Sequence, residues 1–158
     1  MDTEGEFAPA TPAAARERYE SVGPTAQVVV KEVAKAMEMD ADEYGRRVTS
    51  DVVETARDAL FASLLAVHVG TREEFEEWVE SSDYDEDAVW EAGSEHVDNV
   101  VWHAAPAADA VVAATYQDQR RAAVGTLRRQ AFGRVYRELV GETDTSADED
   151  GDEASDAE

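Results

Sequence analysis

Three histidines, His68, His96 and His103, are the side chains whose type could do chemistry, because imidazole binds metal ions and transfers protons near neutral pH. His96 and His103 are seven residues apart, about 10.5 Å along a helix, whereas helical metal pairs use a spacing of three or four. A metal site would therefore need His68 from another segment, with Glu95 or Asp98 as a carboxylate ligand. The alternative is that the histidines are hydrogen-bonded or solvated. We predict this second arrangement, with no metal site and no cofactor.

Other catalytic patterns are missing from the sequence. Three histidines on a helical bundle resemble the metal-dependent hydrolase family related to DNA-damage-inducible proteins, but that family's closely spaced histidine pair is absent here. Di-iron bundles need Glu-x-x-His on two helices, and no histidine has a glutamate three residues before it. The chain also lacks Gly-x-Ser-x-Gly and a glycine-rich phosphate loop. We predict a protein without catalysis, with a hydrolase of the three-histidine bundle type as an alternative.

A basic segment near the carboxyl end could serve nucleic-acid binding or charge compensation. Residues 127–140 carry four arginines against one glutamate, in a chain of net charge −23. Projected as a helix, the arginines point in separate directions, and Arg128 falls within the apolar arc. Phosphate binding would oppose the net charge and would weaken steeply in salt. We predict that these guanidinium groups neutralise carboxylates of this chain or of a protein partner, and that nucleic acid is not a partner.

Residues 33–48, VAKAMEMDADEYGRRV, resemble the helix-turn-helix of bacterial-type repressors. The apolar positions of that pattern are filled by Ala34, Met37, Met39, Tyr44 and Val48. Glu38, however, stands where the family usually has glycine, and Asp42 and Glu43 would repel phosphate at the DNA-reading positions. A DNA-binding regulator that uses residues 33–48 therefore remains an alternative function.

The composition indicates the cellular setting. The 158 residues include 37 acids and 14 bases, of which two are lysines, and the absence of cysteine excludes disulfides and thiolate metal sites. Such an acidic surface repels itself in dilute buffer but is screened in molar salt. The chain shows neither a signal peptide nor an apolar run of membrane-spanning length. We predict a cytoplasmic protein, surrounded by high-salt counterions and not associated with a membrane.

Helical periodicity predicts the elements that position these residues. We expect an all-α fold, a compact bundle of six to eight helices, with a central helix over 52–69 and a long final helix over 107–140. Val97, Val100, Val101 and Ala104 share one face of another predicted helix, and Thr71 with Glu74 forms a capping box. Residues 1–10 are predicted to be a flexible N-terminus, 11–140 a single helical domain and 141–158 a disordered acidic tail.

Two segments, residues 99–139 and 47–65, resemble a family of short acidic haloarchaeal proteins that is known only as a domain of unknown function. The resemblance covers about residues 7–140, and it implies a helical domain and a haloarchaeal source without any activity or site. From the residues, we predict a protein that interacts with a partner or associates with itself. The candidate surface consists of Trp102, His103, Tyr116, Tyr136, Arg128 and Arg129. The alternative is that these aromatic side chains fill the core.

Overall fold

The computed structural model describes residues 1–141, which form an α/β fold built on a five-stranded mixed sheet. The sheet order is β1-β2-β4-β5-β3, with β3 parallel to β5 and all other neighbours antiparallel. The strands are β1 (Asp2–Glu4), β2 (Val67–Thr71), β3 (Val89–Ala92), β4 (Asn99–Ala105) and β5 (Ala110–Thr115). The prediction of an all-α bundle is therefore wrong.

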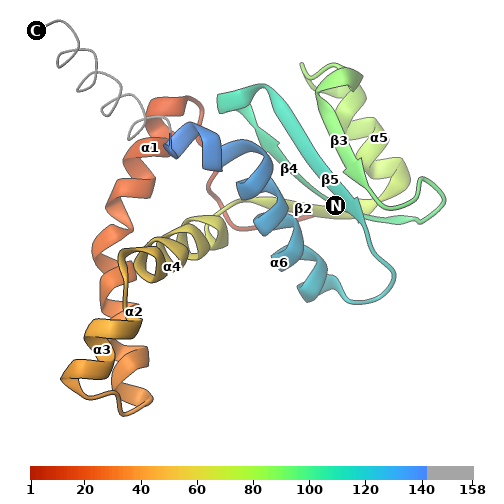
Figure 1. The fold of residues 1–158 in the computed structure, drawn as a ribbon. Helices are drawn as coiled ribbons and strands as arrows, with labels where there is room; N and C mark the ends of the chain where they lie inside the picture. The colour runs from red at the N-terminus through yellow and green to blue at the C-terminus, as the bar shows by residue number, and fades with distance from the viewer. Residues whose placement is uncertain (142–158) are drawn as a thin grey trace, which may run out of the picture.

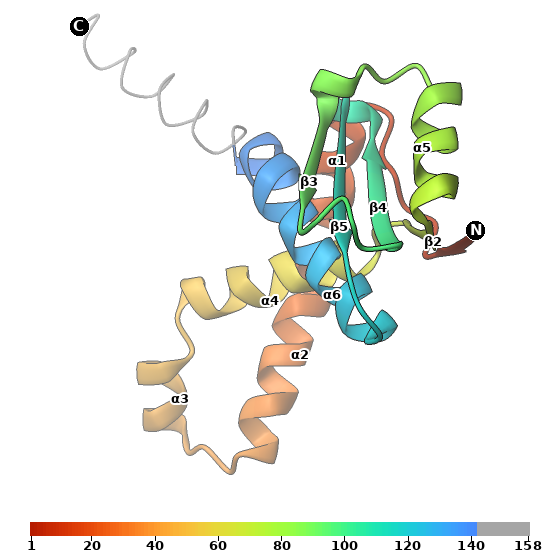
Figure 2. The ribbon, with the colours of Figure 1, turned by 90° about the vertical axis from the view of Figure 1, so that its right-hand side faces the viewer.

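Helices cover both faces of the sheet. The strands were not predicted because their side chains are buried on both sides and do not alternate with polar residues. α5 (Arg72–Ser81) packs on one face and α6 (Arg120–Ala131) on the other (Figures 1 and 2). Consecutive side chains of β4, Val100 to His103, are all 0% exposed. A strand buried on both faces reads as a continuous apolar run without alternation. The predicted helix containing Val97 and Val100 is in fact a loop followed by β4, and the predicted final helix includes β5.

Side chains cap the first turns of three helices. α1 (Pro12–Ser21) begins after Thr11, whose side chain accepts from the Ala14 amide, and α3 (Ala41–Arg47) begins after Asp40 in the same way. The capping box of Thr71 and Glu74 is present at the start of α5. The predicted helix over 52–69 was too long, because α4 (Ser50–Ser63) ends before β2. Single turns of 3₁₀ helix occupy Glu86–Ala88 and Pro106–Ala108, and a π-helical turn, Phe132–Tyr136, continues α6.

The amino-terminal end is paired with the sheet. Residues 1–10 were expected to be flexible, but β1 pairs with β2 as an edge strand and Phe7 forms an isolated bridge with Leu65. The predicted acidic tail lies outside the described residues from position 142 onward. None of the helices within residues 1–141 has the length and apolar character that crossing a bilayer requires.

Three helices form an arm that extends away from the sheet (Figures 1 and 2). We call residues 23–59 the helical arm; it contains α2 (Gly23–Ala36), α3 and most of α4, and α2 packs along α4. Its base is fixed to α1 through Tyr19, whose hydroxyl donates to Asp58 Oδ1 at 2.6 Å. Arg57 Nε donates to the Tyr19 carbonyl at 2.8 Å, and its guanidinium lies 4.3 Å from the centre of the Tyr19 ring.

Candidate functional site

The residues predicted to form an interaction surface lie mainly in the core. Trp102, His103 and Tyr136 are each 0% exposed, so they cannot contact a partner in this structure. Trp102 packs instead against Phe75 and Trp78 of α5, with ring centroids 5.0 and 5.9 Å away. The remaining candidates are Tyr116 and Arg128, which are half-buried, and Arg129, which is exposed. This correction leaves no continuous aromatic surface at the predicted place.

His103 occupies a closed hydrogen-bonded position between the sheet and α6. Its Nδ1 lies 2.6 Å from the Ala66 carbonyl and its Nε2 lies 2.6 Å from the Tyr136 hydroxyl. Because a carbonyl can only accept, Nδ1 donates to Ala66 and Nε2 accepts from Tyr136, which sets the neutral tautomer. Burial lowers the pKa of His103 to about 4. Both ring nitrogens are thus used in holding β4 to its neighbours.

The three histidines do not converge on one place. His68, in β2, has its Nδ1 2.9 Å from Thr3 Oγ1, and burial lowers its pKa. His96 is exposed in the loop between β3 and β4. Within residues 1–141, no group of three histidine or carboxylate side chains is arranged to hold a metal ion. The three histidines therefore lie in three separate environments.

The arginines of α6 and its continuation mostly make internal contacts. Arg120 bonds to carboxylates, with Nε 3.0 Å from Glu4 Oε2 and Nη1 3.1 Å from Asp2 Oδ2. Arg128 instead donates to the carbonyls of Leu65 and Glu4, at 2.9 and 3.2 Å. Arg134 lies over the Trp90 ring, 3.6 Å from its centre. Arg120 lies before residues 127–140, for whose arginines neutralisation of carboxylates was predicted. Within the described residues, Arg128 bonds to carbonyl groups and Arg134 lies over an aromatic ring, so neither supports that prediction.

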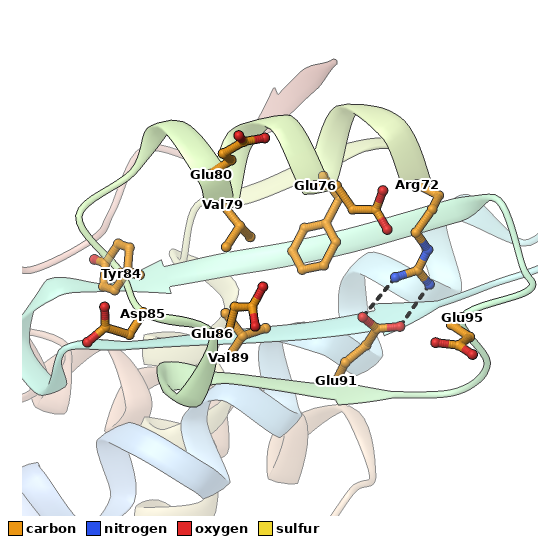
Figure 3. A pocket seen from close by; sticks show the side chains of 11 residues that line it. Arg72, Glu76, Val79, Glu80, Tyr84, Asp85, Glu86, Val89, Glu91 and Glu95 are labelled. Atoms are coloured by element: carbon orange, nitrogen blue, oxygen red, sulfur yellow. Dashed lines mark hydrogen bonds and ion pairs between the residues drawn. The ribbon is translucent and has the colours of Figure 1, made fainter.

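A cleft lies between α5 and β3 (Figure 3). Its volume is about 830 Å³, and its apolar part is formed by Phe75, Val79 and Val89. Arg72 donates two hydrogen bonds to the Glu91 carboxylate, at 2.9 and 2.8 Å, and this carboxylate raises the pKa of Arg72. Five further carboxylates line the cleft, those of Glu76, Glu80, Asp85, Glu86 and Glu95. The cleft suits positively charged groups, and one guanidinium of the chain itself already occupies it.

The helical arm carries a different kind of surface. Apart from Met1, every exposed large hydrophobic side chain of residues 1–141 lies in this arm, and Val33 and Met37 are 52% and 58% exposed. An open groove of about 350 Å³ runs between α2 and α4. Its lining is apolar except for Arg47 and Thr55 and consists otherwise of Val29, Val30, Val33, Ala34, Met37, Met39, Val48, Val52, Ala56 and Ala59. We call this feature the arm groove.

The arm groove was not predicted from the sequence, although the spacing of apolar residues in α2 indicates an apolar face. Val29, Val33 and Met37 follow each other at intervals of four, which places them on one face of a helix. The side chains that α2 buries are Ala26, Val30 and Ala34, one position farther round the helix. Val28 adds an exposed apolar side chain on another side, beside a hollow lined also by Lys31 and Tyr44. An α2 with more apolar positions than one buried face needs was the available clue.

The segment that resembles a helix-turn-helix does contain two helices joined by a turn. α2 ends at Ala36 and α3 begins at Ala41. Glu38 has φ 57°, the left-handed conformation, at the turn position where the repressor pattern usually has glycine. The first turn of α3 carries Asp42 and Glu43. The turn geometry thus agrees with the resemblance, while the charges at the DNA-reading positions do not.

Comparison with known proteins finds one family. The model of a family described as "Family of unknown function (DUF5809)" matches residues 6–137. No curated protein and no solved structure matches the chain.

Proposed function

Since the chain belongs to this family of unknown function, which supplies no activity, we propose on structural grounds that it is a non-catalytic protein that binds a protein partner through its arm groove. One observation carries the proposal: among residues 1–141, the exposed large hydrophobic side chains other than Met1 all lie in the helical arm. Contiguous exposed apolar surface is typical of interaction sites, because water contact with it is unfavourable.

The distribution of burial supports this reading. The sheet and its flanking helices bury large side chains such as Phe61, Leu65 and Leu127 completely. The same chain leaves Val33 and Met37 more than half exposed. These two side chains do not stand singly on a polar surface, because both line the same open apolar groove. The groove becomes dry only when another molecule fills it.

The direct test compares the wild-type chain with the double variant Val33→Ser, Met37→Ser. In extract of the native cells, kept at about 2 M KCl so that surface charges are screened, the wild type should run in a complex heavier than the 17.2 kDa chain. The variant should run alone, while Glu76→Gln with Glu80→Gln, in the cleft of Figure 3, should keep the complex. A wild type that always runs alone, or a variant that forms the same complex, would contradict the proposal.

A DNA-binding regulator is the second candidate, and the left-handed Glu38 in the turn between α2 and α3 is the observation that favours it. Asp42 and Glu43 oppose it, as does a net charge of −23, because each repels the phosphate backbone. Retention on duplex DNA at two salt concentrations tests it. DNA binding that weakens with salt and is lost in Arg46→Ala with Arg47→Ala would favour the regulator over the protein-binding function.

A further inference from the structure

We infer that the occupant of the arm groove is an amphipathic α-helix of another protein, with an apolar stripe flanked by lysines or arginines. This inference rests on the proposed function and specifies its partner. It draws on the shape of the groove, on the charges along its two edges and on the place of the chain's own basic helix.

The shape of the groove suits a helix. Its two long walls are the helices α2 and α4, whose backbone groups are bonded within each helix, so an added β-strand would find no free ladder to join. From Val29 to Met37 the α2 wall extends about 12 Å, at 1.5 Å per residue. A bound helix with apolar side chains at i, i+4 and i+7 has anchors spread over about 10.5 Å. The groove therefore accommodates three such anchors.

The floor of the groove suits side chains of varied size. The small side chains of Ala34, Ala56 and Ala59 leave room for the ridge of another helix to approach. Met37 and Met39 stand at its far end, and the unbranched thioether chain of methionine adapts to differently shaped partners. The site thus selects an apolar stripe at helical spacing more than a particular sequence.

Charged residues of both signs lie beside the groove. Glu32 lies three residues after Val29 on the outer side of α2, and its side chain is 62% exposed. Asp51 lies four residues before Thr55, which lines the groove on α4, whereas the Asp58 carboxylate is bonded to Tyr19 at the base of the arm. Lys31 lines the hollow on the opposite side of the arm, whereas Lys35 Nζ lies 3.5 Å from Glu32 Oε1 and pairs with that carboxylate. Arg47, at the far end, lies 3.9 Å from Glu43.

The net negative charge of the chain and of its arm favours a basic partner over a second copy of this chain. Two chains of net charge −23 repel each other, and the helical arm itself holds eight acids against five bases. The one strongly basic helical segment among the described residues begins with α6, and its apolar side chains Val124, Leu127 and Phe132 are buried in the core. A second copy thus cannot offer a basic amphipathic helix from residues 1–141.

The experiment uses the full chain and three synthetic helical peptides in fluorescence anisotropy. The first has leucine at i, i+4 and i+7 with flanking lysines, the second replaces those lysines with glutamates, and the third replaces the leucines with serines. At about 0.1 M salt, where the Debye length is about 10 Å, we expect the first peptide to bind at least tenfold more tightly than either other peptide. Its affinity should fall as salt is raised.

Two matched protein variants separate the groove from the general acidity of the chain. Glu32→Gln with Asp51→Asn should weaken binding of the lysine peptide several-fold, whereas Glu76→Gln with Glu80→Gln removes the same charge elsewhere and should leave it unchanged. Equal losses in both variants, or equal binding of the glutamate peptide, would overturn the inference. A homodimer that dissociates in Val33→Ser, Met37→Ser would also overturn it while leaving the proposed function intact. Peptide binding that ignores Val33 and Met37 would refute both.

Discussion

The helical arm differs from the rest of the described chain, residues 1–22 and 60–141, which we call the body. The two regions differ in which side chains they bury and which they expose. In the body, even polar groups are drawn inside and bonded, as His103 is between Ala66 and Tyr136. In the arm, apolar groups such as Val33 and Met37 are left facing outward. The body therefore contains the interactions that stabilise the fold, and the arm contains surface that contributes little to the stability of the isolated chain. This difference can be measured residue by residue.

The largest expected effect is at Trp102 in the body. Trp102→Ala should lower the free energy of unfolding by about 4 kcal/mol, because it empties a fully buried site between β4 and α5. Trp102→Phe should cost much less, since Trp102 Nε1 is buried and has no hydrogen-bond partner among the described residues. Denaturant titration measures both. Similar losses for the two variants would show that the indole nitrogen is satisfied in solution.

The second effect is the response of the body to acid through His103. Its pKa is about 4 when folded and 6.5 as a free side chain, so the unfolded chain binds more protons between these values. The free energy of unfolding is therefore unaffected by this histidine above pH 6.5. It falls by about 3 kcal/mol as the pH is lowered to about 4. Denaturant titrations across this range should show the loss, and His103→Leu should remove most of it. His68 adds a loss of the same sign, because its pKa is also lowered.

The third effect lies at the joint between body and arm. Tyr19→Phe removes the hydrogen bond to Asp58 Oδ1 and should cost about 1 kcal/mol. The ring contact with Arg57 and the bond from Arg57 to the Tyr19 carbonyl remain in this variant. Hydrogen exchange should therefore quicken at the start of α2 and the end of α4 while β4 stays protected. Uniform quickening across the sheet would mean that the joint belongs to the cooperative core.

The same contrast explains what sequence analysis could predict. The start of α5 was predictable because the capping box of Thr71 and Glu74 lies within four residues of the sequence. β4 and β5 were not, because their burial depends on α5 and α6, which pack on them from elsewhere in the chain. At the candidate site, the apolar spacing of α2 was readable. The exposure of this apolar face could not be predicted, because it depends on how the other helices pack around α2.

The smallest expected effect on stability is in the arm groove. Val33→Ser with Met37→Ser should change the free energy of unfolding by no more than about 0.5 kcal/mol per residue, because both side chains are more than half exposed and leave no cavity. Val30→Ser is the matched control on the same helix, since Val30 is 8% exposed and packs toward α4. It should cost clearly more in the same denaturant titration. If the Val33 and Met37 substitutions lower the free energy of unfolding as much as Val30→Ser does, the chain itself closes the groove in solution. The arm would then not differ from the body in exposing apolar surface.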